Sequence, residues 1–294
     1  MVSGYTERYL ERCRAHGRQH LLLNGQVFTR SGSIIGPSGP AVEGSNLDRQ
    51  QCRALLKAFG GGVVRYTNGF RADNRPGEWY SVISRKFTPL EDLPHKRRYQ
   101  IKGSLRRCQA RLISADELAA TGYRVYLQAI KRYKGTKISV PTAEEFQQNV
   151  AREAPFPDLV DHWGLYFENA LIGFSQNLII GNLEAYYSTT KLDPEYFKYD
   201  PGYALIYCMN EHYLRRRGFQ YVNDGFRSVY HETNMQSFLI ENFGFEKAYT
   251  GLSLRYSPLF KWLMRLGYPL RRVLGRLDRR AAALFEMERC ARRS

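Results

Sequence analysis

Three side chains in the second half of the chain are of the types that accept a proton during group transfer. Glu184 lies in an apolar run, where an unpartnered carboxylate would have a raised pKa and could act as a base; the alternative is an outward-facing strand residue. Asp224 follows a strand-like run and precedes Gly225, so it either points into a cleft or forms an Asp-Gly turn. His231 titrates near neutrality and is either a base or a structural histidine. We predict Glu184, Asp224 and His231 as catalytic candidates.

A turn with small residues precedes the helix that the spacing predicts over 202–217. It has the sequence Tyr199-Asp200-Pro201-Gly202-Tyr203-Ala204. Small side chains let backbone N–H groups approach a phosphate at a helix N-terminus, where the partial positive charge favours an anion. We therefore expect this turn to bind a phosphorylated donor.

The charge of the chain favours anionic partners. Lys and Arg number 44 against 28 Asp and Glu, which gives a net charge of +16. Residues 96–111 contain seven basic residues and no acidic one. Arg98, Lys102 and Arg106 have i,i+4 spacing on one face of the helix expected there, and Arg97 lies beside them. We predict that these four side chains bind a phosphorylated donor or acceptor; a solvated helix face is the alternative.

The cysteines and histidines do not form a metal-binding pattern. The five cysteines are too widely spaced for a CxxC pair, and His16 and His20, four residues apart, lack further ligands at metal-binding spacing. Scattered thiols are typical of a reducing cytosol. Because there is no apolar run of membrane-spanning length and the N-terminus carries charges where a signal peptide is apolar, we expect a cytoplasmic protein without a metal.

The hydrophobic pattern predicts an α/β chain. Strands are expected over 26–29, 63–67 and 79–83, and helices over 46–57 and 115–134, with Ser114 as N-cap and Glu117 completing a capping box. After a polar, proline-containing segment at 141–158, a hairpin is expected over 165–175, turning at Glu168-Asn169. Strands at 178–180, 183–187, 219–224 and 248–256 and helices at 202–217 and 233–243 complete the pattern.

The order hairpin, strand, helix, strand, helix, strand over 164–256 resembles the acetyltransferase (GNAT) superfamily. Asn234, followed by an apolar helix that ends in Gly244-Phe245, is similar to the closing helix motif of that family. The turn at 199–204 resembles its pyrophosphate loop at Gly202 and Ala204, with a tyrosine where Gln or Arg is usual. Residues 93–101, followed by a basic helix, resemble the junction segment of Fem-like acyltransferases, which have two tandem GNAT-like halves.

The resemblance implies an acyl donor site in the second half. Strands of the family splay at the site and expose a backbone N–H to the donor carbonyl, which we expect at 186–188. The residues implied in donor binding are Tyr186, Tyr187, Ser188, Tyr199, Gly202, Tyr203, Ala204 and Asn234. The tyrosine that often acts as the acid in this family would fall at Ile240. Because no Cys or Ser lies in a nucleophile motif, direct attack by the acceptor is the mechanism implied.

Three functions follow from these features. We predict an N-acyltransferase that moves an acyl group from a thioester, acyl-CoA or acyl carrier protein, to an amine on a small molecule, a peptide or a lipid-linked acceptor. The first alternative is a Fem-type transferase that takes an aminoacyl group from charged tRNA. The second alternative is a non-catalytic, basic RNA- or membrane-binding protein on a GNAT scaffold.

The C-terminal segment 258–294 has an amphipathic, basic pattern. Apolar residues recur every three or four positions, interrupted by Pro269, and ten basic against three acidic residues give a charge of +7. Such a pattern is typical of a helix at the surface of an anionic membrane. We expect peripheral association with the inner face of the membrane; a terminal helix packed on the body of the protein is the alternative.

The expected fold class is α/β (α+β), with two GNAT-like domains and a helical tail. Each domain is expected to have a mixed, mostly antiparallel sheet flanked by helices. The predicted boundaries are 1–138 for the N-terminal half, 139–257 for the C-terminal domain with the active site, and 258–294 for the tail.

Overall fold

The fold was analysed in a computed structural model that describes residues 4–131, 139–229 and 234–294. The chain forms two compact units. The first comprises Met1–Val82, Gly225–Gln236 and Glu246–Ser294, and the second comprises Ile83–Asp224 and Ser237–Phe245. Strands β5 (Tyr80–Ser84) and β10 (Tyr221–Phe226) each run from one unit into the other. These two units group residues that contact one another in the structure. The domain boundaries predicted from the sequence, 1–138, 139–257 and 258–294, stay a prediction.

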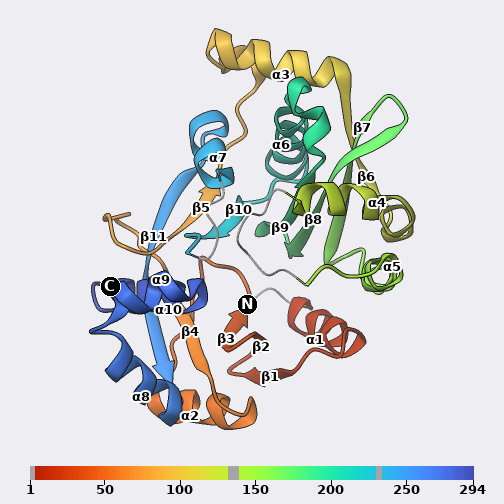
Figure 1. Ribbon diagram of the computed structural model, residues 1–294. Coiled ribbons are helices and arrows are strands. Elements are labelled where there is room, and N and C mark those ends of the chain that lie inside the picture. The colour runs from red at the N-terminus through yellow and green to blue at the C-terminus, as the bar shows by residue number, and fades with distance from the viewer. Residues whose placement is uncertain (1–3, 132–138, 230–233) are drawn as a thin grey trace. The chain divides into compact units, whose positions relative to one another are not determined.

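The sheet of the first unit begins with an antiparallel meander. It is formed by β1 (His20–Leu23), β2 (Gln26–Ser31) and β3 (Ile34–Ser38). Strand β4 (Val63–Phe70) is parallel to β3, and β11 (Glu246–Tyr256) is antiparallel to β4. Helix α1 (Tyr5–Ala15) packs on β2, and α2 (Arg49–Ala58) connects β3 to β4 and packs on β4 (Figure 1). The core under α2 contains Phe28, Ile35, Leu55, Phe59 and Val64.

The sheet of the second unit has the same kind of pattern. Strands β6 (Cys108–Ile113), β7 (Val160–Phe167), β8 (Ala170–Ile180) and β9 (Glu184–Leu192) are successively antiparallel, and β10 is parallel to β9. The helices are α3 (His95–Arg107), α4 (Ala115–Ile130), α5 (Ala143–Ala151), α6 (Pro201–Asn210) and α7 (Met235–Phe243). Helix α6 connects β9 to β10, as α2 connects β3 to β4. Each unit therefore has a mixed, mostly antiparallel sheet flanked by helices, which confirms the fold class.

Local sequence signals specify several elements of the second unit. The hairpin turns at Glu168-Asn169 as predicted, with Glu168 at φ +54° and Phe167 opposite Ala170. Ser114 caps α4 by accepting from the Glu117 N–H at 3.0 Å. The predicted capping box is wrong, because the Glu117 carboxylate pairs with Arg111 and accepts from the Tyr166 hydroxyl at 2.6 Å instead.

The basic helix is shorter than its sequence pattern indicates. The helix was expected within residues 96–111, but α3 ends at Arg107 and β6 begins at Cys108. The reason is a long-range ladder, in which Cys108 pairs with Phe167 and Ile113 pairs with His162. Strand β6 was therefore missed in the sequence.

The tail is helical and broken at Pro269, as predicted. It forms α8 (Pro258–Gly267), α9 (Arg271–Leu277) and α10 (Arg279–Ala291). Helix α10 packs on the first unit, with Met287 and Cys290 buried in a cluster that includes Trp79 and Leu252. Within the described ranges, no helix has the length and apolar character needed to cross a membrane.

Candidate functional site

Strands β9 and β10 are paired over only part of their length. The parallel register joins 184–186 to 221–223, and β9 continues to Leu192. Asp224 is the next residue of β10 and is partly exposed. Burial, the phenol of Tyr213 and the charge of Asp224 together raise the pKa of Tyr187 well above its ordinary value. Because Asn223 pairs with Tyr186 at the end of the register, Asp224 lies level with Tyr187 where the two strands part.

A β-bulge lies at the same level of β9. Tyr187 pairs with Asn177 of β8, whereas Thr189 pairs with Gln176, so Ser188 is an extra residue on β9. The extra residue of a bulge is not part of the strand ladder, and bulges commonly aim a group into a functional site. The Ser188 hydroxyl fixes the bulge by donating to the Gln176 carbonyl oxygen at 2.6 Å. We call Tyr186, Tyr187, Ser188 and Asp224 the strand-end site.

Glu184 lies at the other end of β9. It is buried, with 2% exposure, and its carboxylate accepts hydrogen bonds from the Tyr221 hydroxyl and, at 2.7 Å, from the Asn223 amide. Both donors come from β10, so these bonds tie the paired segment of the two strands together. A carboxylate held in this way is suited to positioning β9 against β10, and its role as a base stays a prediction.

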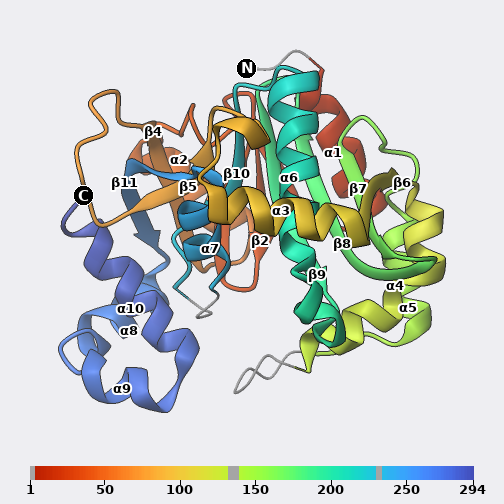
Figure 2. The same ribbon diagram turned by 90° about the horizontal axis from the view of Figure 1, so that it is seen from above.

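The N-terminus of α6 is closed by a residue of α3. The Ser104 hydroxyl donates to the Asp200 carbonyl at 2.8 Å and accepts from the Ala204 N–H at 3.1 Å. The Tyr203 N–H donates to the Asp200 carbonyl at 3.0 Å, and Pro201 has no N–H to offer. Helix α3 packs across α6 at this point (Figure 2). The N–H groups of Tyr203 and Ala204 are thus bonded within the chain rather than presented to a phosphate.

The side chains of the same turn also contact the protein. Tyr199 stacks on Phe167 at 4.6 Å between ring centroids, and the Tyr203 hydroxyl donates to Asn242 at 3.2 Å. A Cβ at Gly202 would lie 3.6 Å from the side chains of Leu192 and Phe238. The structure therefore brings Tyr199, Gly202, Tyr203 and Ala204 together as predicted, in a turn packed against its own neighbours.

The predicted anion-binding residues of α3 divide into two kinds. Arg98 donates to the carbonyl oxygens of Glu91 at 2.8 Å and Leu93 at 3.1 Å, so it braces the start of the helix. Lys102 and Arg106 are exposed, and Arg97 is half-buried. Lys102 and Arg106 are accordingly available to a phosphorylated ligand.

A buried network at the other end of α6 had no signal in the sequence. The Tyr213 hydroxyl donates to Asp161 at 3.0 Å and accepts from Trp163 at 2.9 Å and from Asn177 at 3.1 Å. Tyr213 lies in a π-helical segment, Glu211–Arg216, that follows α6. Burial raises the pKa of the Asp161 carboxyl despite the nearby Arg217. Since its members lie far apart in sequence, only the sheet register reveals that they meet.

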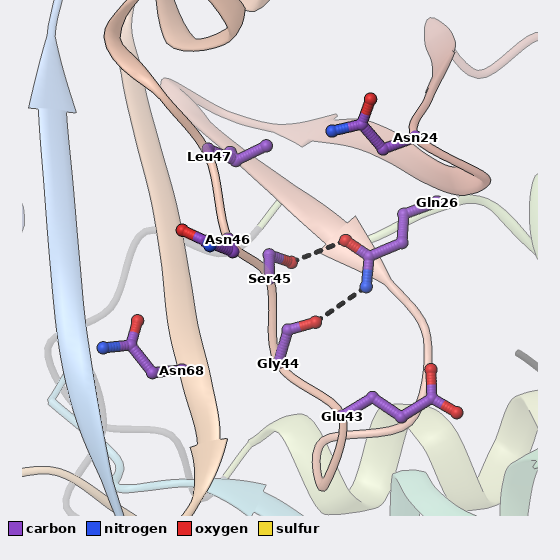
Figure 3. A pocket seen from close by; sticks show the side chains of 8 residues that line it. All are labelled: Asn24, Gln26, Glu43, Gly44, Ser45, Asn46, Leu47 and Asn68. Atoms are coloured by element: carbon purple, nitrogen blue, oxygen red, sulfur yellow. Dashed lines mark hydrogen bonds between the residues drawn. The ribbon is translucent and has the colours of Figure 1, made fainter.

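The first unit contains a polar pocket of about 540 Å³ (Figure 3). Its lining is rich in amides and comes from the β1–β2 turn, the loop before α2 and β4: Asn24, Gln26, Glu43, Gly44, Ser45, Asn46, Leu47 and Asn68. The Gln26 amide donates to the Gly44 carbonyl at 2.7 Å and accepts from the Ser45 hydroxyl at 2.8 Å. Such a lining suits a ligand with hydroxyl or amide groups. The sequence analysis did not identify this pocket.

Two further predicted residues, His231 and Asn234, are not part of the strand-end site as defined here. His231 falls outside the residues that the structure describes. Asn234 is exposed directly before α7. Nowhere in the described ranges do three or more His, Cys, Asp or Glu side chains gather to hold a metal ion.

Comparison with known proteins identifies the second unit. Residues 95–225, which run from α3 to β10, match the family model described as acetyltransferase (GNAT) domain. FemX is similar in structure, with a TM-score of 0.55 and 10% identity over 88% of this chain and 92% of that chain. No curated protein matches this sequence.

Two other solved structures are similar at lower scores. The C-terminal domain (DUF2156) of a putative lysylphosphatidylglycerol synthetase from Agrobacterium fabrum has a TM-score of 0.47 and 11% identity over 75% of this chain and 78% of that chain. The PaiA N-acetyltransferase from Thermoplasma acidophilum, in complex with coenzyme A, has a TM-score of 0.31 and 20% identity over 37% of this chain and 73% of that chain.

The family match agrees with the topology of the second unit. The GNAT model covers the hairpin, the bulged strand β9 and the β9–α6–β10 crossover. The similarity to FemX extends over most of the chain and so includes both units. The second unit of this chain thus contains a GNAT acetyltransferase domain, at residues 95–225, and the chain as a whole has a Fem-like fold.

Proposed function

We propose that this protein transfers an acyl group to an amine at the strand-end site. The observation that carries the proposal is the bulge at Ser188, which coincides with the level where β9 and β10 part. A backbone N–H outside the ladder can donate to the oxygen of a carbonyl placed between the strands, where negative charge develops during attack. Asp224 follows Asn223, the last residue of β10 in the β9–β10 register, and we propose it as the base.

The reaction is a direct displacement. The amine nitrogen attacks the carbonyl carbon of the donor, and its proton passes to the Asp224 carboxylate. The C–N bond forms, the oxyanion accepts a hydrogen bond from the bulge N–H, and the bond to the leaving oxygen or sulfur breaks as that atom takes up a proton. Glu184 has both carboxylate oxygens in hydrogen bonds and acts by holding β9 to β10.

The donor that we propose is an aminoacyl ester of tRNA. Coenzyme A bound in the manner that the resemblance implies would need the N–H groups at the start of α6, and Ser104 and Asp200 engage two of them. A tRNA donor can be held through its backbone phosphates instead. The exposed Lys102 and Arg106, in a chain of charge +16, provide cations for such contacts.

An acyl thioester, carried by coenzyme A or by a carrier protein, is the second candidate donor. The match of residues 95–225 to an acetyltransferase domain supports it. A ligand-induced shift of Ser104 would free the Ala204 N–H for a phosphate. The amine acceptor, whether a small molecule, a peptide or a lipid-linked amine, is common to both donors.

Native mass spectrometry of the purified chain distinguishes the donors. The protein is mixed in turn with acetyl-CoA, a long-chain acyl-CoA and total aminoacylated tRNA. We expect a complex with tRNA that weakens steeply with added salt, because phosphate contacts release counterions. A stable complex with an acyl-CoA and none with tRNA would reject the tRNA donor and leave the transfer reaction intact.

The strand-end site is tested by acyl transfer to hydroxylamine, measured above the uncatalysed rate with the donor that binds. Ser188→Pro removes the bulge N–H, and we expect the rate to fall about a hundredfold or more, whereas Ser188→Ala retains the N–H and most activity. Asp224→Asn should lose about a hundredfold or more through loss of the base. Asp73→Asn, at an exposed position of the first unit, is the matched control. Full activity in both Ser188→Pro and Asp224→Asn would refute the proposed site.

A further inference from the structure

Helices α8 and α9 and the turn between them expose a group of large apolar side chains. Six of its residues recur at a spacing of three or four: Leu259, Trp262, Leu266, Leu270, Val273 and Leu277. Their exposed fractions run from 53% for Leu266 to 79% for Leu277. We call these six residues the tail face. Single exposed apolar residues are common, but a row of this length marks a surface that binds something.

The tail face is not the side by which the tail attaches to the protein. In α8 a different stripe packs inward, since Met264 is buried and Phe260 packs against the cluster that also contains Trp79. Helix α10 supplies the rest of the attachment through Met287 and Cys290. Packing of the tail on the first unit therefore leaves the tail face exposed.

A cationic pocket lies at the base of α8. Its volume is about 800 Å³, and it is formed by α2, the end of β11 and the start of α8. Five basic residues line it: Arg49, Arg53, Lys57, Arg255 and Lys261. Among the residues that the structure describes, none of the five forms a salt bridge. The carboxylate at the start of α2, Asp48, is used as the helix cap.

The arrangement of these cations has a cost for the helix that carries them. Arg49, Arg53 and Lys57 are at i, i+4 and i+8 on α2, and like charges at this spacing destabilise a helix by about 0.2–0.5 kcal/mol for each pair. The helix dipole favours Lys57 at the C-terminal end, but it disfavours Arg49 in the first turn. Other arginines of this unit do form salt bridges, as Arg289 does with Glu78 and Arg227 with Glu286.

We propose that the tail face and the cationic pocket together bind the surface of a membrane that contains anionic phospholipids. The apolar stripe enters the boundary between headgroups and acyl chains, and the pocket receives an anionic headgroup at the base of the same helix. Lys261, on α8 and in the pocket lining, joins the two parts. Self-association of this chain through the tail face is the outcome that the experiment must separate. This inference goes beyond the acyl transfer proposed above and does not depend on it.

The test uses the full-length protein and vesicles of two compositions, phosphatidylcholine alone and equal parts of phosphatidylcholine and phosphatidylglycerol. We expect co-sedimentation with the anionic vesicles and much less with the neutral ones. Of the three tryptophans, Trp79 and Trp163 are buried at 1% and 4% exposure, whereas Trp262 is 61% exposed. Insertion of the tail face should therefore shift the fluorescence of Trp262 to shorter wavelength, and Trp262→Gln should abolish the shift.

Paired variants separate the two parts of the surface. Arg53→Gln with Lys57→Gln should weaken binding to anionic vesicles by roughly twenty-five-fold, at about fivefold for each cation. Leu266→Gln should weaken binding to both kinds of vesicle. Arg14→Gln and Leu22→Gln, at exposed positions of α1 and β1, are the matched controls and should bind as the unchanged protein does.

Two results would overturn the proposal. One is that the protein stays in solution with both kinds of vesicle. The other is that the protein self-associates in sedimentation velocity, that Leu266→Gln abolishes this, and that the charge variants have no effect on vesicles. The second result would make the tail face an interface between copies of this chain.

Discussion

The two β–α–β crossovers have the same topology but complete the N-terminus of their helix in different ways. In β3–α2–β4, the cap is local: the Asp48 carboxylate accepts from the Gln51 N–H at 2.8 Å, and the Gln51 side chain accepts from the Asp48 N–H at 2.9 Å. In β9–α6–β10, the cap comes from α3, where the Ser104 hydroxyl bonds to both Asp200 and Ala204.

A glycine precedes or begins the helix in each crossover, and the two glycines differ as well. Gly44 has φ +65°, and a Cβ there would lie 2.0 Å from the Gly69 nitrogen. At Gly202 the nearest atoms would be 3.6 Å from a Cβ, which is an ordinary contact. Gly202, which lies in the turn that resembles a phosphate-binding loop, is thus at a position where the fold would accept a side chain. Gly44 is at a position where it would not.

The different caps and glycines of the two crossovers indicate where a ligand can approach the N-terminus of each helix. In the first crossover, the close contact of Gly44 with β4 holds the loop 43–47 against the strand, and the loop lines an open polar pocket (Figure 3). In the second crossover, the chain itself fills the place that a phosphate would take. We infer that a ligand of the second unit approaches at the strand ends of β9 and β10 rather than at α6.

The largest effect is expected for Gly44→Ala. The substitution places a methyl group 2.0 Å from backbone and forces a positive φ on a residue with a Cβ. We expect a loss of about 3 kcal/mol or more in the free energy of unfolding, measured by denaturant titration. Gly39→Ala is the control, since a Cβ there meets nothing within 4 Å. Equal stability of the two variants would show that the close contact of the loop with β4 is not needed.

Ser104→Ala should give the next largest effect. It leaves the buried Ala204 N–H and the Asp200 carbonyl without their partner, at a cost of about 2 kcal/mol. Ser31→Ala, at an exposed position of β2, is the control. If closure of the turn is what excludes coenzyme A, the variant should also bind acetyl-CoA more tightly than the unchanged protein. A variant as stable as the unchanged protein would mean that α6 does not depend on α3 for its cap.

Asp48→Ala removes the local cap of α2 and should cost about 1 kcal/mol. Asp48→Asn should restore most of the stability, because asparagine caps a helix about as well as aspartate does. Thermal unfolding of the three proteins measures the difference. If Asp48→Asn were as damaging as Asp48→Ala, the carboxylate charge rather than the cap would be responsible.

Features that depend only on residues close together in the chain could be predicted from the sequence. The turn at Glu168-Asn169, the Ser114 cap and the break of the tail at Pro269 are all local, and all three predictions are confirmed. The Ser188 bulge lies within the segment where the family resemblance placed the exposed N–H.

The features that the sequence analysis missed depend on contacts between distant segments. Helical spacing carried the expected helix past Arg107, but pairing with β7 makes Cys108–Ile113 a strand. Ser104 acts on a turn about a hundred residues away, and Tyr213 meets Asp161 and Asn177 only once the sheet has formed. A motif of small residues indicates that backbone is accessible, but tertiary packing decides whether its N–H groups are already bonded.

The smallest effect is expected for Gly202→Ala, which compares the two glycines directly. The new methyl group makes only ordinary contacts with Leu192 and Phe238, and alanine favours a helix over glycine by up to about 1 kcal/mol. We expect unchanged or slightly raised stability and unchanged acyl transfer. The alternative is sharp: a donor phosphate on this turn would meet the methyl group. Suppose that Gly202→Ala unfolds at the same denaturant concentration as the unchanged protein but no longer transfers the acyl group. That result would indicate that a donor phosphate binds at the N-terminus of α6, and it would favour coenzyme A as the donor.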